Sequence, residues 1–227
     1  MKNTTTMLGL GFAGGLLALT LAAAAPASTD AAPMFEVTVT NLTRGQIFSP
    51  LLVTSHTSDI SLFVAGEPAL PELGTLAEEG NNAPLAALLG GLAVIEDVQT
   101  GAGGILPGAS DTVMIRATGK APYISLASML VNTNDAFVGL DAFQITRELD
   151  ATVYAVAYDA GTEFNSESCD FIPGPACGSA GAHDPAPAEG YVYVSNGVQG
   201  VGDLATDLYD WRNPVAKITI RRMVNMP

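Results

Sequence analysis

The segment FEVTVTNLT, residues 35–43, alternates apolar and polar side chains with a period of two. This alternation is typical of a β-strand that buries one face and exposes the other. Near the opposite end of the chain, Ala216, Ile218 and Ile220 alternate with polar residues in the same way. The two segments predict half-buried strands near both ends of the folded region.

Five more segments between these two are rich in β-branched or aromatic residues, which favours strands. They are Ala93–Val98, Asp111–Ala117, Tyr123–Val131, Ala151–Tyr158 and Tyr191–Val194. Only Pro71–Glu79 and Ala83–Leu89 favour helices, and Asn82 is a candidate N-cap for the second. Short strands separated by Gly, Pro, Asn and Asp turns predict an all-β fold, an antiparallel β-sandwich with one or two short helices in its connections.

The composition excludes several classes of protein. With 48% apolar and 14% charged residues, the chain is too apolar to be intrinsically disordered. Its 23 acidic and 9 basic residues leave a net charge of −14. This balance argues against a nucleic-acid partner, because phosphate recognition needs clustered Lys and Arg.

The first 27 residues have the pattern of a secretory signal peptide. Lys2 precedes an apolar run over residues 7–25, and Ala25-Pro-Ala27 is a small-residue cleavage signal. A membrane anchor is the alternative, since the run is nearly long enough to span a bilayer. We expect a signal peptide at 1–27, a short exposed segment at 28–34 and one domain at 35–222. The protein would then be secreted or periplasmic, without stable membrane insertion after cleavage.

Two segments without periodicity, Gly161–Gly190 and Gly197–Arg212, predict long loops. Cys169 and Cys177 both lie in the first of them, and export permits disulfides. Free thiols and a two-Cys metal half-site are the alternatives. We expect a Cys169–Cys177 disulfide.

Motifs for catalysis are sparse. Neither a G-x-S-x-G elbow nor an H-E-x-x-H motif occurs, and the Gly-rich run Gly200–Ala205 lies too near the chain end for a dinucleotide-binding unit. His56 follows a strand-like run, where a histidine is usually a hydrogen-bonded structural residue. His183 lies in the Pro-rich loop and is expected to be solvated. The sequence predicts no catalytic residue and no enzyme.

The acidic residues are more informative. Asp159 and Glu163 flank a turn at Gly161 that follows a strand, and Asp135 follows an earlier strand. Strands running in the same direction deliver their ends to one edge of a sandwich, so the two loops can converge. Ca²⁺ takes six to eight oxygen ligands on adaptable loops. Solvated loop carboxylates are the alternative in so acidic a chain.

Three blocks carry a resemblance to a known family: ASMLVNTNDAFVGL at 127–140, YDAGTE at 158–163 and PVAKITIR at 214–221. In order and spacing they resemble the spondin N-terminal-type domain, which occurs in F-spondin, mindin and many bacterial exported proteins. The resemblance spans roughly Phe35 to Arg222 and is faint from Leu70 to Pro107. It implies a C2-like antiparallel β-sandwich that binds Ca²⁺ with loops at one edge.

The metal carboxylates implied by this resemblance are Asp135, Asp159 and Glu163. Two departures stand out: the family usually reads Ser-Pro-Asp-Trp where this chain has Thr133-Asn-Asp-Ala136, and Glu163 stands where animal members have Asp. The implied function is that of a secreted calcium-binding module with a binding, adhesion or matrix role toward an extracellular protein or glycan. A metal-dependent hydrolase using the same carboxylates near His56 and a metal-free structural envelope protein are the alternatives.

Overall fold

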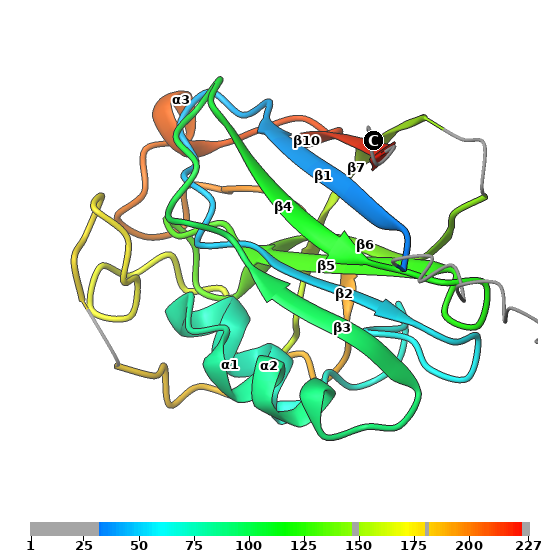
Figure 1. Ribbon diagram of the computed structural model, residues 1–227. Helices are drawn as coiled ribbons and strands as arrows, with labels where there is room; N and C mark the ends of the chain where they lie inside the picture. Colours follow the sequence, from blue (N-terminus) through cyan, green and yellow to red (C-terminus); the bar gives the residue numbers. More distant parts are fainter. Residues whose placement is uncertain (1–31, 147–149, 180–181, 224–227) are drawn as a thin grey trace, which may run out of the picture. The chain divides into compact units, whose positions relative to one another are not determined.

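The computed structural model describes residues 32–146, 150–179 and 182–223 (Figure 1). The signal peptide expected at 1–27 lies outside the described residues. The strands are β1 (Met34–Asn41), β2 (Leu52–His56), β3 (Ile95–Thr100), β4 (Ser110–Arg116), β5 (Tyr123–Met129), β6 (Ala136–Gln144), β7 (Ala151–Ala155), β8 (Ala157–Asp159), β9 (Tyr193–Val194) and β10 (Ala216–Met223). The helices are α1 (Pro71–Glu79), α2 (Ala83–Gly90) and α3 (Thr206–Tyr209). Within the described residues, none of the helices has the length and apolar character of a membrane span.

Two antiparallel sheets face each other in a sandwich, which confirms the predicted all-β class. One sheet has four strands in the order β4-β1-β10-β7, and the other has six in the order β3-β2-β5-β6-β8-β9. The two terminal strands predicted from the sequence, β1 and β10, are paired over their whole length, from Met34 opposite Met223 to Asn41 opposite Ala216. The first and last parts of the described chain therefore lie side by side at the centre of one sheet (Figure 1).

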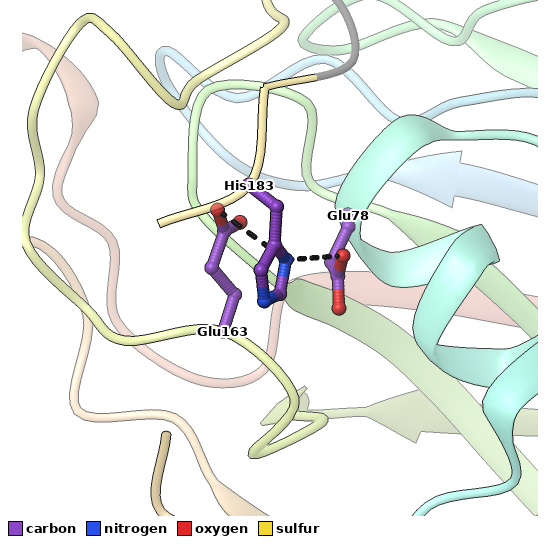
Figure 2. A group of neighbouring side chains, drawn as sticks. All are labelled: Glu78, Glu163 and His183. Carbon is purple, nitrogen blue, oxygen red and sulfur yellow. Dashed lines mark hydrogen bonds and ion pairs between the residues drawn. The ribbon is translucent and has the colours of Figure 1, made fainter. Parts of the chain in front are cut away.

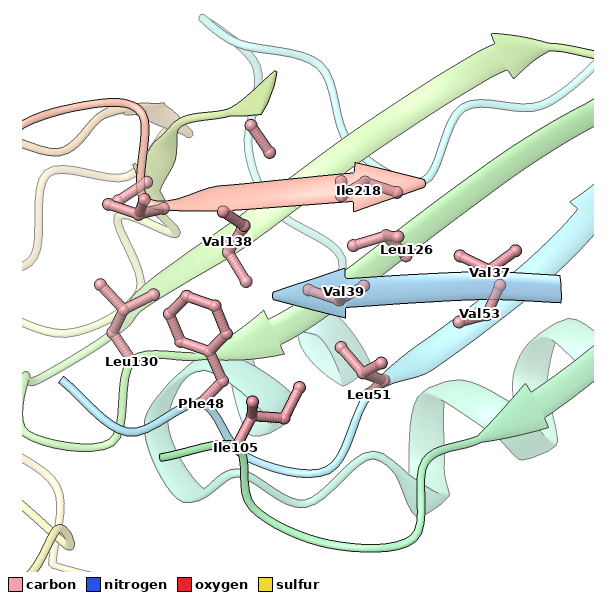
Figure 3. Close-up of a cluster of buried hydrophobic side chains, with 14 of the residues drawn as sticks. Val37, Val39, Phe48, Leu51, Val53, Ile105, Leu126, Leu130, Val138 and Ile218 are labelled. Carbon is pink, nitrogen blue, oxygen red and sulfur yellow. The ribbon is translucent and has the colours of Figure 1, made fainter. Parts of the chain in front are cut away.

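The main core fills the space between the sheets (Figure 3). β1 alternates between buried and half-buried residues, since only one of its faces meets this core. It contributes Val37 and Val39, which are fully buried beside Ile218 of β10. The facing sheet contributes Val53 and Leu126.

The six-stranded sheet is covered on both faces. Side chains next in sequence to its core residues, such as Leu52, Ala127 and Phe137, point to the opposite face, where they pack against α1 and α2. As a result β2 is buried at all five of its positions and shows no alternation in its sequence. For this reason its sequence, Leu-Val-Thr-Ser-His, indicates only a strand-like run.

Some predicted element bounds need correction. The strand expected at Ala151–Tyr158 is divided, because β7 pairs in the four-stranded sheet and β8 pairs in the six-stranded sheet. β6 is a separate strand that the sequence does not predict, and α3 lies inside a predicted loop. Asn82 makes no side-chain cap hydrogen bond to α2; its amide instead donates to the carbonyl oxygens of Pro50 and Leu51, each at 3.3 Å.

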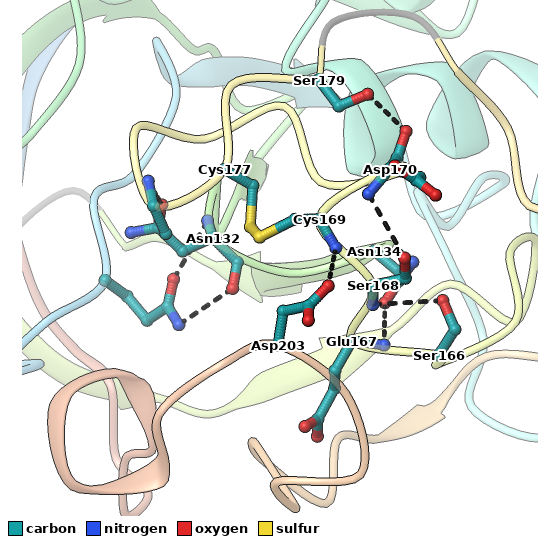
Figure 4. Close-up of a disulfide and its surroundings, with 12 residues drawn as sticks. Asn132, Asn134, Ser166, Glu167, Ser168, Cys169, Asp170, Cys177, Ser179 and Asp203 are labelled. Carbon is teal, nitrogen blue, oxygen red and sulfur yellow. Dashed lines mark hydrogen bonds between the residues drawn. A yellow bond between two sulfur atoms is a disulfide. The ribbon is translucent and has the colours of Figure 1, made fainter.

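The predicted Cys169–Cys177 disulfide is present and closes a short ring in the long loop after β8 (Figure 4). Hydrogen bonds hold both ends of this ring to the rest of the domain. The Cys169 N–H donates to Asp203 Oδ2 at 2.8 Å, and the Ala176 N–H donates to Asn132 Oδ1 at 3.0 Å. The loop is thus tied to the segment that leads into Asp135.

Candidate metal centre

Asp135 and Asp159 are brought together by the pairing of β6 with β8. Asp135 immediately precedes β6, Asp159 ends β8, and Ala136 lies opposite Asp159 in the ladder. A further backbone hydrogen bond joins the Ala160 N–H to the Asp135 carbonyl at 3.1 Å. The expected convergence is therefore present, but its cause is different: the start of one strand lies beside the end of its antiparallel neighbour.

The Asp135 side chain is fully buried. Its Oδ2 accepts hydrogen bonds from the backbone N–H groups of Thr162 at 2.8 Å and Glu163 at 3.1 Å. Its Oδ1 is buried and has no hydrogen-bond partner. Because an unsatisfied buried carboxylate oxygen is costly, this atom marks a place where a cation would be favourable.

Asp159 is 1% exposed and is held on both oxygens. Its Oδ1 accepts from the Gly161 N–H at 2.9 Å, and its Oδ2 accepts from the Asn165 amide at 2.8 Å. The same Asn165 nitrogen lies 3.0 Å from the Tyr193 hydroxyl and 3.3 Å from Glu189 Oε1. These contacts fix the orientation of the Asp159 carboxylate beside Asp135.

The electrostatics of this pair disfavour two negative charges. Burial, with the neighbouring Asp159 charge, raises the pKa of Asp135 well above its ordinary value. Burial also raises the pKa of Asp159 to about 6, against the opposing effect of its hydrogen bonds from Asn165 and Gly161. Burial and the same carboxylates raise the pKa of the Tyr193 phenol, which therefore stays protonated. A divalent cation would relieve the repulsion between the two carboxylates.

The Glu163 carboxylate faces a different set of residues. Its Oε1 accepts from the Asp184 N–H at 2.6 Å and lies 3.9 Å from His183 Nδ1, which in turn lies 3.0 Å from Glu78 Oε2 (Figure 2). Burial is the main cause that raises the pKa of Glu163 to about 7. The Glu163 backbone N–H donates to Asp135, whereas the Glu163 carboxylate groups with Glu78 and His183. The structure therefore places Asp135 and Asp159 on paired strands, and Glu163 in a second group of side chains.

Several residues at this edge are not singled out by the sequence: Glu78, Asn165, Glu189 and Tyr193. His183 is expected from the sequence to be solvated; its side chain is 56% exposed, yet it is engaged with two carboxylates. Glu78 comes from α1, and it meets His183 across 105 residues of sequence. No local pattern signals such a contact. Asn165 follows closely after the Asp-Ala-Gly-Thr turn, and this position of a polar residue is the one clue that the sequence offers.

His56 lies at the other end of the sheet. It pairs with Tyr123 at the start of β5, whereas Asp135 comes after the end of that strand. Seven residues of strand span about 20 Å. The buried ring is held by Ser125 Oγ at 2.8 Å and by the Thr57 carbonyl at 2.7 Å. His56 is a hydrogen-bonded structural residue, as expected, and the proximity that the hydrolase alternative requires is absent.

The family model described as Spondin_N matches residues 40–170, which is more than half of the chain and includes Asp135, Asp159 and Glu163. The chain belongs to the Spondin_N family. No curated protein matches it. Membership of this spondin family, together with the disulfide, fits an extracellular or exported protein.

Proposed function

We propose that this spondin domain is an exported calcium-binding module with a binding, adhesion or matrix role outside the cell. The observation that carries the calcium proposal is the buried, unpartnered Oδ1 of Asp135 beside the buried carboxylate of Asp159. Both are hard oxygen ligands of the kind Ca²⁺ prefers. The proposed partner is an extracellular protein or glycan, and the support for it is the family resemblance.

Asp135 and Asp159 would hold the ion, and Glu163 is the third ligand predicted from the sequence. Bound Ca²⁺ would neutralise two buried charges and join the start of β6 to the end of β8. Glu163 Oε1 accepts from the Asp184 N–H and lies near His183, so its contribution to calcium binding is tested separately by mutation. Mg²⁺ should bind less well, because it demands a tighter octahedron and gives up its water reluctantly.

Thermal unfolding with and without calcium tests this proposal. An ion that binds only the folded protein at a hundred times its dissociation constant stabilises by about 2.7 kcal/mol. We expect a higher Tm in millimolar Ca²⁺ than in chelator. Asp159→Asn should remove most of that difference, since it deletes a charge while keeping the shape.

Asp207→Asn is the matched control, because Asp207 is an exposed aspartate on α3. It should retain the full calcium shift. If calcium leaves the Tm of wild type unchanged relative to chelator, the calcium proposal is wrong and the metal-free structural alternative stands. Glu163→Gln then reports separately whether the third predicted ligand contributes.

A further inference from the structure

A second group of potential metal ligands lies beside the Asp135–Asp159 pair. Within the described residues, Glu78, Glu163 and His183 are the one set of three His, Cys, Asp or Glu residues whose ligand atoms all lie within 4.8 Å of one another. Figure 2 shows the His183 ring from the later loop between Glu78 of α1 and Glu163 of the turn after β8, with dashed lines from its Nδ1 to an oxygen of each. Three segments remote in sequence thus present one nitrogen and two carboxylates to the same point.

The spacing of these atoms suits a small tetrahedral ion. Metal-to-ligand distances near 2.1 Å place two ligands of a tetrahedral Zn²⁺ about 3.4 Å apart. His183 Nδ1 lies 3.0 Å from Glu78 Oε2 and 3.9 Å from Glu163 Oε1. An ion at this point would bind the lone pair of neutral His183 at Nδ1, in the tautomer that carries the imidazole proton on Nε2.

Neighbouring groups hold Glu163 in one orientation and add negative electrostatic potential near Glu78. The Asp184 N–H fixes one oxygen of Glu163 at 2.6 Å, and the Glu163 side chain is only 1% exposed. Hydrogen bonds of this kind commonly hold metal ligands in position. Glu78 sits in the last turn of α1, which contains no basic residue. The partial negative charge of a helix C-terminus adds to the two carboxylates and favours a cation there.

We propose that Glu78, Glu163 and His183 form a transition-metal site that binds a divalent ion such as Zn²⁺, distinct from the Asp135 and Asp159 carboxylates. The imidazole nitrogen decides the class of metal, since hard Ca²⁺ and Mg²⁺ take oxygen ligands whereas Zn²⁺ readily takes a histidine. Two carboxylates neutralise the ion, and the exposed side of His183 leaves room for water as a fourth ligand. The proposal does not depend on calcium binding by Asp135 and Asp159.

Calorimetric titration with Zn²⁺ tests this site on protein purified without a polyhistidine tag, both with and without millimolar Ca²⁺, because Glu163 is also the third predicted calcium ligand. We expect one equivalent of Zn²⁺ to bind, and His183→Asn and Glu78→Gln to weaken it at least about tenfold. His183 and Glu78 are partly exposed, so neither change should unfold the protein. Co²⁺ in place of Zn²⁺ should give the intense visible absorption of a tetrahedral site in wild type and lose it in His183→Asn.

Two controls make the outcome decisive. Glu79→Gln changes the exposed neighbour of Glu78 on the same helix, and Asp159→Asn changes the candidate calcium ligand. Neither should alter the Zn²⁺ dissociation constant. Equal Zn²⁺ binding by wild type and His183→Asn would overturn the proposal, as would a loss of binding in Asp159→Asn that matches the loss in Glu78→Gln. Absence of a calcium shift in wild type, with Zn²⁺ binding intact, would overturn the calcium proposal alone.

Discussion

At the scale of single residues, the buried carboxylates near the edge of β6 and β8 hold their protons more tightly than ordinary acids do. Asp135, Asp159 and Glu163 are all nearly inaccessible to solvent, and burial raises the pKa of each. An acid whose pKa is raised by folding binds its proton more tightly in the folded protein than in the unfolded chain. Folding is then favoured at low pH and opposed where the group must ionise.

The first prediction follows for the protein in chelator. Unfolded Asp and Glu titrate near their ordinary pKa values of 3.8 and 4.5, whereas Asp159 and Glu163 titrate at about 6 and about 7 in the folded protein. Between about pH 4 and pH 7 the folded protein holds more of these protons, so its stability should fall as the pH rises. Tm measured at pH 5 and pH 7.5 should be lower at the higher value. Asp159→Asn should reduce this slope, and a Tm in chelator that rises over the interval would contradict the argument.

At the scale of elements, the turn after β8 holds the site together. Gly161 has a φ of +65°, and a Cβ at this position would lie 2.2 Å from the Tyr191 carbonyl oxygen. Only glycine meets both conditions without moving the neighbouring backbone. The turn is also the source of the N–H groups that bind Asp135 and Asp159.

We expect Gly161→Ala to destabilise the protein by more than about 1 kcal/mol and to weaken calcium binding. Gly108→Ala is the matched control, because Gly108 has a φ of +76° but no atom within 4 Å of the position that a Cβ would take. The free energy of unfolding of both variants is measured by chemical denaturation. The loss in Gly108→Ala reports the cost of positive φ alone, and the additional loss in Gly161→Ala reports the clash with Tyr191. Equal losses in the two variants would show that the approach to Tyr191 is of no consequence.

The disulfide ring is the second element with a measurable contribution. A loop closed across 8 positions removes little entropy from the unfolded chain, so the expected stabilisation is about 2 to 3 kcal/mol. The double variant Cys169→Ser, Cys177→Ser should lose about this much in free energy of unfolding. Titration of two free thiols in the denatured, unreduced protein would contradict the prediction.

Alternation of apolar and polar residues predicted the strands that have one exposed face, whereas β5, which is buried on both faces, was predicted from its β-branched and aromatic residues. One face of β1 and of β10 is exposed to solvent, so apolar and polar residues alternate along both strands. Their positions were predicted to within a few residues. β2 and the first half of β6 are buried on both faces and carry no such pattern. The chain breaks between β7 and β8 because the two segments join different sheets. The local pattern of apolar residues does not predict which sheet a strand joins.

At the scale of the whole molecule, the remaining prediction concerns export. If residues 1–27 are a signal peptide, protein recovered from the periplasm or the medium should begin between Ala25 and Pro33, as measured by mass spectrometry of the intact chain. Cleavage leaves a strongly acidic domain, since residues 1–27 contain Lys2 as their single charged side chain. Recovery of the chain starting at Met1 from membranes would favour the anchor instead.

The sequence by itself predicted the all-β class, the terminal strands, the disulfide and the family, and it named Asp135, Asp159 and Glu163 together as metal carboxylates. Each of these rests on a local pattern or a short block such as YDAGTE at 158–163. Only the tertiary structure decided that Glu163 faces Glu78 and His183, and that His56 lies at the far end of β5. Both facts depend on contacts between residues that are far apart in the sequence. Packing between elements sets the direction of these side chains, and such packing produces no periodic pattern in the sequence.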